Sequence, residues 1–193
     1  MLIVGDNLKH LILQHGMCND EKAFDQNSIT LSLDRQLISI KSPSVSDELT
    51  YGHHIPNSWL NRFMMEDSGY VLPARGYVLG CSREEIKIPS GYFGLLQTKG
   101  SLARLFVMVH CGDGQVDAGY SGRITFELVN LAGLNIRLLP LQPIADLFIF
   151  RASTRSVPLY SGRYQSAKGP TIQLPADETS SSSGSFKKKG KNK

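Results

Sequence analysis

Cysteine is scarce in this chain: its 193 residues include three, Cys18, Cys81 and Cys111. They are too few and too widely spaced for the disulfide framework of a small secreted domain. Reduced thiols are typical of cytoplasmic proteins, so we expect a cytoplasmic location. We interpret Cys18 and Cys81 as small hydrophobic residues of the core.

Long hydrophobic runs are absent as well. No apolar stretch approaches the ~20 residues that span a membrane. The first residues place no basic segment before an apolar one, so we expect no signal peptide. With 41% hydrophobic residues, the composition predicts a soluble globular protein of one domain, long enough to bury an ordinary core.

Positive charge is concentrated near the C-terminal end. The formal net charge is +4, and removing the five lysines at positions 187, 188, 189, 191 and 193 leaves −1. Residues 176–193, where serines precede these lysines, are predicted to form a disordered, solubilising tail. Contact of the lysines with nucleic acid or anionic lipid is the alternative. The rest of the sequence predicts no specific binding of nucleic acid and no membrane attachment.

Short stretches of alternating hydrophobic and polar residues dominate the pattern. An amphipathic helix is expected over residues 6–16, with Asp6 as its N-cap and Gly16 closing it. Strands are expected over residues 28–33, 37–41, 77–81, 85–88, 92–97, 124–129, 136–139 and 144–150. Turns with Gly or Pro separate several of them, which is typical of an antiparallel sandwich or barrel. Residues 42–61 are expected to form a long surface excursion.

A basic turn, Lys99-Gly100-Ser101-Leu102-Ala103-Arg104, interrupts the strands. One helical turn here would gather backbone N–H groups, a hydroxyl and two cations, which together suit a polyphosphate. The alternative is a turn that closes a barrel end, with Arg104 on the surface. Downstream, Asp117 precedes a glycine-rich turn and Glu127 lies inside an apolar strand. Two carboxylates in unlike surroundings can divide hydroxyl binding and proton transfer between them.

This arrangement resembles the dCTP deaminase and dUTPase superfamily, and Glu127 within its strand points to the deaminase branch. The similarity includes the N-terminal helix, residues 27–33, residues 99–130 without an evident gap, and Tyr160-Ser161-Gly162-Arg163-Tyr164-Gln165. It implies a mainly β fold, a distorted, jelly-roll-like barrel of the dUTPase type over residues 1–175. It also implies a homotrimer with active sites between subunits, over which residues 160–175 would close.

The resemblance implies a role for each site residue, with Glu127 as the catalytic one. The substrate-binding residues would be Lys99, Gly100, Ser101 and Arg104 at the triphosphate, Asp117 at the 3′-hydroxyl with Tyr120 beside it, Thr125 and Phe126 at the base, and Tyr160, Arg163 and Tyr164 over the phosphates. Mg²⁺ would arrive with the nucleotide triphosphate and not through protein ligands. The expected ligands are dCTP and dUTP, with dTTP as a candidate regulator.

The chemistry of cytosine deamination agrees with a glutamate in that strand. Water attacks C4, N3 gains a proton and ammonia leaves, so a carboxylate that accepts and returns a proton suits the reaction. Zinc-dependent deaminases carry H-x-E and P-C-x-x-C instead. Neither pattern occurs here, and His110-Cys111 stands without partners at metal-ligand spacing. We therefore expect a reaction without zinc and no metal held by the protein.

Four positions depart from the family's usual residues. Lys99 replaces an arginine, and Gly100 replaces a serine whose hydroxyl helps orient the catalytic water and the base. Asp113 replaces a small apolar residue, and Ala167 replaces a glutamine of the closing segment. A carboxylate at Asp113 could raise the pKa of Glu127 or repel the triphosphate. These departures bear on turnover more than on fold or nucleotide binding.

Three functions follow as hypotheses. The first is hydrolytic deamination of dCTP to dUTP and ammonia. The second is dUTP diphosphatase activity, alone or combined with deamination, in which Asp117 would help position the attacking water. Plain dUTPases lack a glutamate in this strand. The third, prompted by Gly100, Asp113 and Ala167, is a non-catalytic nucleotide-binding regulator.

Overall fold

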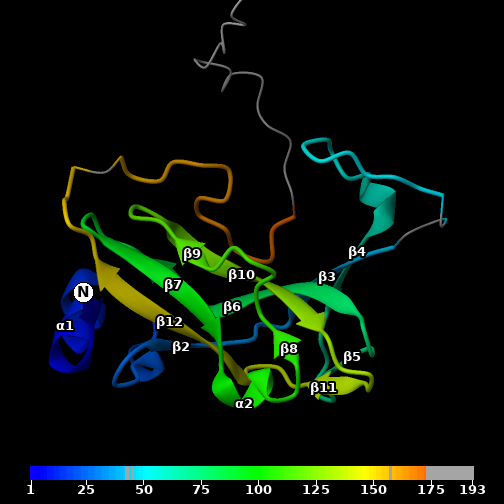
Figure 1. Cartoon of the computed structure of the whole chain (residues 1–193), viewed down its shortest axis with the longest axis horizontal. Helices are drawn as coiled ribbons and strands as arrows, with labels where there is room; N and C mark the ends of the chain where they lie inside the picture. Colours follow the sequence, from blue (N-terminus) through cyan, green and yellow to red (C-terminus); the bar gives the residue numbers. More distant parts are fainter. Residues whose placement is uncertain (42–43, 45, 157, 173–193) are drawn as a thin grey trace, which may run out of the picture.

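A computed structural model describes residues 1–41, 44, 46–156 and 158–172 (Figure 1). The predicted tail over residues 176–193, and the last residues of the predicted closing segment, lie outside the described residues. No helix within the described ranges is long and apolar enough to cross a membrane.

Two antiparallel sheets of five strands form the body, which confirms the mainly β prediction. The first sheet has the order β1-β12-β7-β9, with β2 also paired to β12. Its strands are β1 (Leu2–Ile3), β2 (Ile29–Ser32), β7 (Tyr92–Thr98), β9 (Gln115–Val116) and β12 (Pro143–Arg151). The second has the order β4-β3-β6-β10-β8. Its strands are β3 (Gln36–Ile40), β4 (Leu60–Met64), β6 (Tyr77–Lys87), β8 (Val107–Met108) and β10 (Ser121–Asn130).

Smaller elements complete the structure. A two-stranded sheet joins β5 (Tyr70–Leu72) to β11 (Ile136–Leu138). The helices are α1 (Gly5–His15), the one-turn helix α2 (Gly100–Ala103), and the 3₁₀ turns η1 (Glu21–Ala23) and η2 (Asn57–Trp59). Figure 1 shows α1 beside β12 and β7, and α2 at the opposite end of the molecule from the segment that follows β12.

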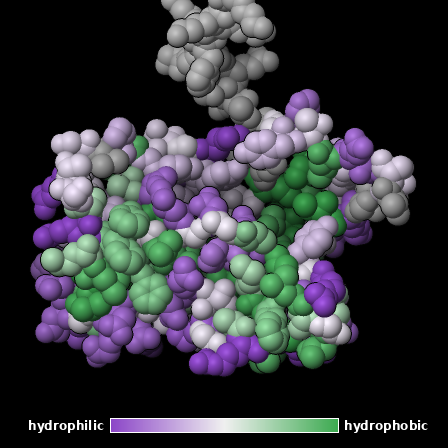
Figure 2. All heavy atoms as spheres, viewed as in Figure 1, coloured by the Kyte–Doolittle hydropathy of each residue, from purple (hydrophilic) through white to green (hydrophobic). Residues whose placement is uncertain are grey.

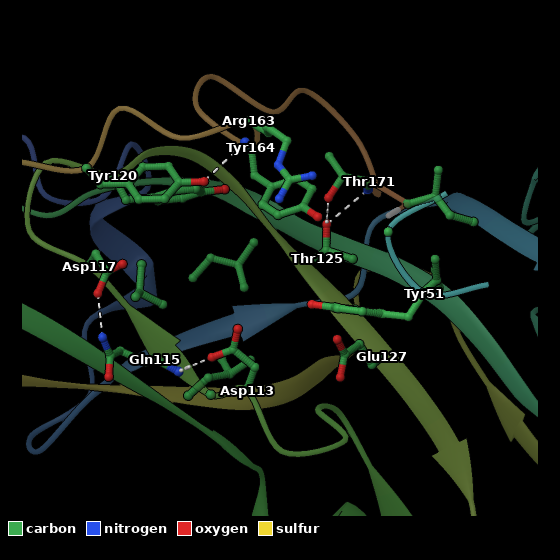
Figure 3. Close-up of a pocket in the computed structure, with 18 residues that line it drawn as sticks. Tyr51, Asp113, Gln115, Asp117, Tyr120, Thr125, Glu127, Arg163, Tyr164 and Thr171 are labelled. Carbon is green, nitrogen blue, oxygen red and sulfur yellow. Dashed lines mark hydrogen bonds between the residues drawn. The ribbon is translucent and has the colours of Figure 1, made fainter. Parts of the chain in front are cut away.

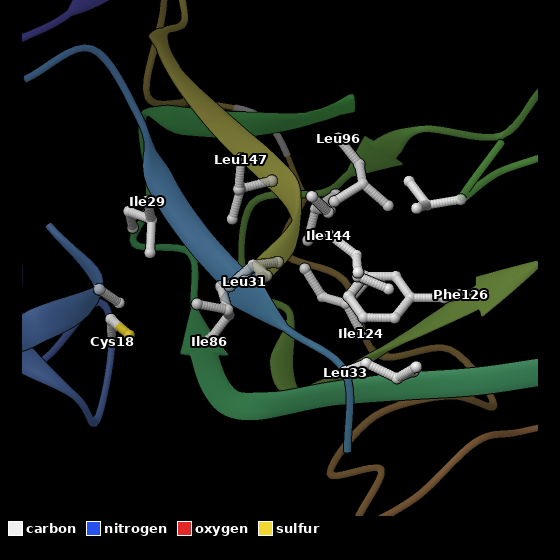
Figure 4. Close-up of a cluster of buried hydrophobic side chains, with 14 of the residues drawn as sticks. Cys18, Ile29, Leu31, Leu33, Ile86, Leu96, Ile124, Phe126, Ile144 and Leu147 are labelled. Atoms are coloured by element: carbon white, nitrogen blue, oxygen red, sulfur yellow. The ribbon is translucent and has the colours of Figure 1, made fainter. Parts of the chain in front are cut away.

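The core lies between the two sheets, where strand alternation directs hydrophobic side chains inward. Along β10, every second residue is buried, and Phe126 and Leu128 are fully enclosed. Both belong to the hydrophobic core cluster, and Figure 4 shows Phe126 in it with Leu147 of β12 and Leu31 of β2. The opposite face of β10 is therefore left for the polar residues of the same strand.

The buried thiols belong to this core, as predicted. Cys18 and Cys81 are buried, whereas Cys111 is exposed. Burial raises the pKa of Cys18 to about 11 and that of Cys81 to about 12. Both side chains therefore remain neutral thiols at neutral pH and pack as small hydrophobic groups.

The predicted helix is confirmed, but its N-terminal cap is not Asp6. Asp6 lies within the first turn, and the N-cap is Val4, whose backbone is extended and whose side chain makes no cap hydrogen bond. At the other end Gly16 adopts the left-handed conformation, with φ of 59°. The prediction that Gly16 ends the helix is therefore confirmed, and glycine suits this position because it adopts the left-handed conformation without strain.

The strands predicted over residues 77–81 and 85–88 form one long strand, β6. A bulge joins them: Glu85 pairs with Arg123 and Cys81 with Thr125 of β10, which leaves three β6 residues opposite one. The Ser82 hydroxyl holds the bulge, because it donates to the Glu84 carbonyl at 2.6 Å and accepts the Ile124 N–H at 2.9 Å. The buried Glu84 carboxylate accepts the Ser32 N–H at 2.8 Å. The bulge fixes β10 just before Thr125.

Candidate functional site

A cavity of about 550 Å³ opens on the polar face of β10 (Figure 3). Its wall is formed by β10, by the loop and turn around β9, by residues 160–172, and by Tyr51 and Gly52 from the loop before η2. The polar side chains on this wall are Tyr51, Asp113, Gln115, Asp117, Tyr120, Thr125, Glu127, Tyr160, Arg163, Tyr164 and Thr171. A volume of this size fits a drug- or nucleotide-sized ligand.

Strand alternation separates Thr125 and Glu127 from the residue between them. Thr125 and Glu127 are partly buried and line it, whereas Phe126 between them is completely buried in the core. The expectation that Phe126 lines a base is therefore wrong for this chain. Successive side chains of a strand point to opposite faces, so three consecutive residues cannot share one wall.

Glu127 is anchored from the loop beside it. One carboxylate oxygen, Oε2, accepts the Cys111 N–H at 2.7 Å. The backbone N–H of Glu127 donates to the Val109 carbonyl at 2.9 Å. The Cys111 thiol lies beside the same carboxylate, and burial together with the charge of Glu127 raises the pKa of this thiol. A carboxylate fixed through one oxygen, with the second on a cavity wall, is suited to exchange protons with a bound water.

A second acidic group lines the cavity next to β9. The Gln115 amide donates from Nε2 to Oδ1 of Asp117, and the Gln115 N–H points to Asp113 Oδ1 at 3.4 Å. Figure 3 shows these side chains along one wall, with Glu127 farther along the cavity. The two predicted carboxylates, Asp117 and Glu127, therefore share one cavity, and Asp113 adds a third carboxylate to it.

Tyr120 closes the turn after Asp117. Its hydroxyl donates to the Arg123 carbonyl, and its ring lies 5.9 Å from the ring of Tyr160. Burial raises the pKa of the Tyr120 phenol well above its ordinary value. The phenol therefore stays protonated and remains a hydrogen-bond donor over the whole working range of a protein.

Residues 158–172 fold back over the cavity and are hydrogen-bonded to β10 and the turn before it. The Ser166 N–H donates to the Ser121 carbonyl at 2.7 Å, and the Arg123 N–H donates to the Ala167 carbonyl at 2.8 Å. Gln165 adds side-chain contacts, accepting the Ser121 N–H at 2.9 Å. Gly122 makes this approach possible: its φ is +144°, and a Cβ there would lie 2.7 Å from the Ala167 nitrogen.

The same segment brings three of the expected residues to the cavity, together with Thr171 and Ile172, which were not expected. Tyr160, Arg163 and Tyr164 all line it, and the Tyr164 N–H donates to the Tyr160 hydroxyl at 3.2 Å. Thr171 contacts Thr125, with 2.8 Å between their hydroxyls and 3.0 Å from the Thr171 N–H to Thr125 Oγ1. The expected closing segment therefore does lie over this cavity in a single chain.

The basic turn over residues 99–104 does not reach this cavity. It forms α2 as expected, with Lys99 preceding the helix and Arg104 following it. None of Lys99, Gly100, Ser101 and Arg104 is among the described residues that line the cavity. The four expected triphosphate residues thus lie apart from the other expected residues of the same chain.

Lys99 already has a carboxylate partner. Its ammonium lies 3.0 Å from Asp146 Oδ1 and 3.4 Å from the Thr30 hydroxyl, and its side chain is 30% exposed. The Thr30 hydroxyl donates to the same Asp146 oxygen at 3.0 Å. This contact fixes Lys99 against β12 and β2, so Arg104 is the more available cation of the turn.

Sequence reasoning missed Tyr51, Gln115 and Thr171. Tyr51 lies in a loop without periodicity, and Thr171 reaches Thr125 only through the chain reversal after β12. Gln115 carries the one local signal, its place two residues before Asp117 at the start of β9.

The fold and this cavity define a class: an antiparallel β protein with a nucleotide-sized site, one wall of which carries a strand-borne glutamate. A sequence profile described as dCTP deaminase-like matches residues 3–152. The chain therefore belongs to the dCTP deaminase-like family, which confirms the resemblance seen in its motifs.

Individual relatives agree with this assignment. The Parafrankia sp. (strain EAN1pec) protein named "dCTP deaminase, dUMP-forming" is 39% identical over 110 residues, which cover 54% of this chain and 55% of the relative. A protein of the same name from Streptomyces avermitilis is 33% identical over 162 residues, covering 79% of this chain and 82% of the relative. The chain thus spans little more than half the length of several curated relatives it matches.

A solved structure shares the fold. The 2'-deoxycytidine 5'-triphosphate deaminase from Agrobacterium tumefaciens superposes with a TM-score of 0.58, covering 77% of this chain and 46% of that one. The two sequences are 15% identical in the superposed region, so this likeness concerns the fold alone.

Proposed function

We propose that this chain hydrolyses the exocyclic C–N bond at C4 of dCTP and releases ammonia. The observation that carries the proposal is Glu127, which faces the cavity from β10 with one oxygen fixed by the Cys111 N–H at 2.7 Å. The strand presents Thr125 on the same face about 7 Å away. This spacing lets one side chain contact the base while the other serves the attacking water.

The proposed reaction needs one proton shuttle. Glu127 accepts a proton from the water that attacks C4, and N3 of the base becomes protonated. The tetrahedral centre then collapses, the C4–N bond breaks, and the leaving amine takes up a proton and departs as ammonia. Among the described residues there is no group of three or more His, Cys, Asp or Glu that could hold a metal ion. In our proposal Mg²⁺ belongs to the nucleotide and is bound through its phosphates.

We further propose that the triphosphate is bound by α2 of a second copy of the chain, within a homotrimer. Arg104 and Ser101 cannot serve the cavity of their own chain, because the turn that carries them lies outside it. Beside this turn, Leu105, Phe106 and Leu131 are exposed by 49%, 68% and 47%. Figure 2 shows hydrophobic side chains gathered over this end of the molecule. An exposed apolar surface next to a phosphate-type turn favours burial against another subunit.

The product proposed from the sequence is dUTP, but a second outcome has specific support. The relatives from Parafrankia and Streptomyces are both named dUMP-forming. In that outcome a second water releases diphosphate from dUTP, so one dCTP and two waters give dUMP, ammonia and diphosphate. Asp117, held by Gln115 on the cavity wall, is the group proposed to position that second water. We therefore take dUMP as the expected final product and dUTP as its precursor.

Incubation with dCTP and Mg²⁺, with ammonia, dUTP, dUMP and diphosphate measured separately, tests these proposals. Ammonia in equal amount to dUMP and diphosphate supports the combined reaction, and ammonia with dUTP supports deamination alone. Binding of dCTP without any product would leave the chain a nucleotide-binding regulator, and dTTP added to the same assay tests its proposed regulatory role.

A further inference from the structure

Tyr51 is the most exposed large hydrophobic side chain of the described residues, and it lines the cavity. Its exposed fraction is 93%, and the cavity wall includes Tyr51 together with Thr125 and Glu127. Single exposed aromatic residues are ordinary on protein surfaces. An exposed ring at the mouth of a ligand-sized cavity can have a binding role, because both of its faces are available to a planar ligand.

The loop holds this ring by a defined turn. The His53 N–H donates to the Thr50 carbonyl at 3.0 Å, and Gly52 has a φ of +88°. A hydrogen bond from the first to the fourth residue, with glycine at the third and a positive φ, is the type II β-turn pattern. Tyr51 occupies the second position of this turn. A few residues later the buried Ile55 fixes the loop to the body.

The ring extends toward the residues proposed to contact the base. Figure 3 shows the phenol of Tyr51 reaching across the cavity between Thr125 and Glu127, with its hydroxyl directed toward the cavity centre. The cavity lining also includes the aliphatic residues Leu79, Ile124 and Val116. A flat heteroaromatic ring placed between an aromatic face and an aliphatic wall loses its contact with water on both sides.

We propose that Tyr51 stacks on the pyrimidine base and is a substrate-binding residue of the site. This inference rests on the proposed function, since it needs a base between β10 and the loop. Stacking of this kind is present both when substrate is bound and in the transition state. It therefore strengthens binding without changing the chemical step, and its loss raises KM while kcat is retained.

The test compares Tyr51→Ala, Tyr51→Phe and Leu49→Ala in the full-length chain. Leu49 is the matched control, because it lies two residues away on the same loop, is 47% exposed and does not line the cavity. We measure KM and kcat for dCTP by ammonia release, and the Kd of dCTP and of inorganic tripolyphosphate by calorimetry. A base–aromatic stack corresponds to an affinity change of about 5- to 150-fold.

We expect Tyr51→Ala to raise KM and Kd for dCTP at least about fivefold, with kcat and tripolyphosphate affinity within about twofold of the wild-type values. Tyr51→Phe should restore most of the lost affinity, because the aromatic face is kept. A KM for Tyr51→Ala that matches Leu49→Ala, or an equal loss for tripolyphosphate, would overturn the stacking role while the wild-type activity stands. If the wild-type chain neither binds nor deaminates dCTP, the proposed function fails, and the stacking role fails with it.

Discussion

Gly100→Ser should raise the turnover of dCTP. The resemblance to dCTP deaminases implies a serine at this position, whose hydroxyl would orient the catalytic water and the base. A serine can replace this glycine only if the backbone does not require a positive φ. Gly100 meets this condition: its φ is not positive, and it is the first residue of α2. The nearest atom to a Cβ at this position is Nη1 of Arg104, at 3.3 Å. A flexible guanidinium can move by a few tenths of an ångström, so we expect the variant to fold normally.

The magnitude follows from one hydrogen bond that strengthens in the transition state. Such a bond is worth about 1–3 kcal/mol, or roughly ten- to a hundredfold in rate. Because α2 lies outside the cavity of its own chain, the gain also requires α2 of a neighbouring copy to complete the site. Turnover should therefore rise only in the assembled protein and should fall on dilution below the assembly concentration.

The assay is the steady-state rate of ammonia release at saturating dCTP, with light scattering to follow assembly. Gly133→Ser is the matched control, since a Cβ at Gly133 meets nothing within 4 Å and its φ is not positive. A trimeric Gly100→Ser protein with unchanged or lower turnover would refute the reasoning. The extra carboxylate of Asp113 on the cavity wall would then be the next feature to change.

Three other predictions address phosphate binding, the core and the closing segment. Arg104→Ala should weaken the binding of dCTP far more than the binding of deoxycytidine, as measured by calorimetry, because charge-assisted hydrogen bonds to phosphate oxygens are lost. An equal loss of affinity for both ligands would mean that the role of Arg104 is structural. Phe126→Ala should lower the free energy of unfolding by about 3–5 kcal/mol in urea titrations, and a loss under about 1 kcal/mol would contradict its place in the core. Gly122→Ala should speed limited proteolysis within residues 158–172, because a Cβ there meets the Ala167 nitrogen at 2.7 Å; an unchanged cleavage rate would show that the segment is held elsewhere.

Much of the fold could be predicted from local patterns. The alternation along β10 and β12 predicted their positions correctly, and Gly16 marked the end of α1. The break expected between residues 81 and 85 was wrong, because a bulge held by Ser82 continues β6 across it. Strand β5 was missed because its partner, β11, comes from a distant part of the chain. Strand β4 was missed as well: it begins inside the expected surface excursion over residues 42–61 and pairs with the preceding strand, β3.

The site was predictable where one strand or turn defines it, and not where distant segments meet. Glu127 and Asp117 lie in one cavity as their surroundings suggested. Phe126 was misassigned because the motif was read as a block instead of as an alternating strand. The contact of Lys99 with Asp146 was not predicted, because it depends on β12 and β2 lying beside the turn, which no local pattern contains.

The most direct test of the central claim compares the wild-type chain with Glu127→Gln. The amide keeps the shape of the side chain and can still contact the Cys111 N–H, which Glu127 accepts at 2.7 Å, but it cannot shuttle a proton. General acid–base catalysis is typically worth ~10²–10⁴-fold. We predict that ammonia release from dCTP falls by at least about a hundredfold while the Kd of dCTP changes little. A variant that keeps more than about a tenth of the wild-type rate would remove Glu127 from the mechanism.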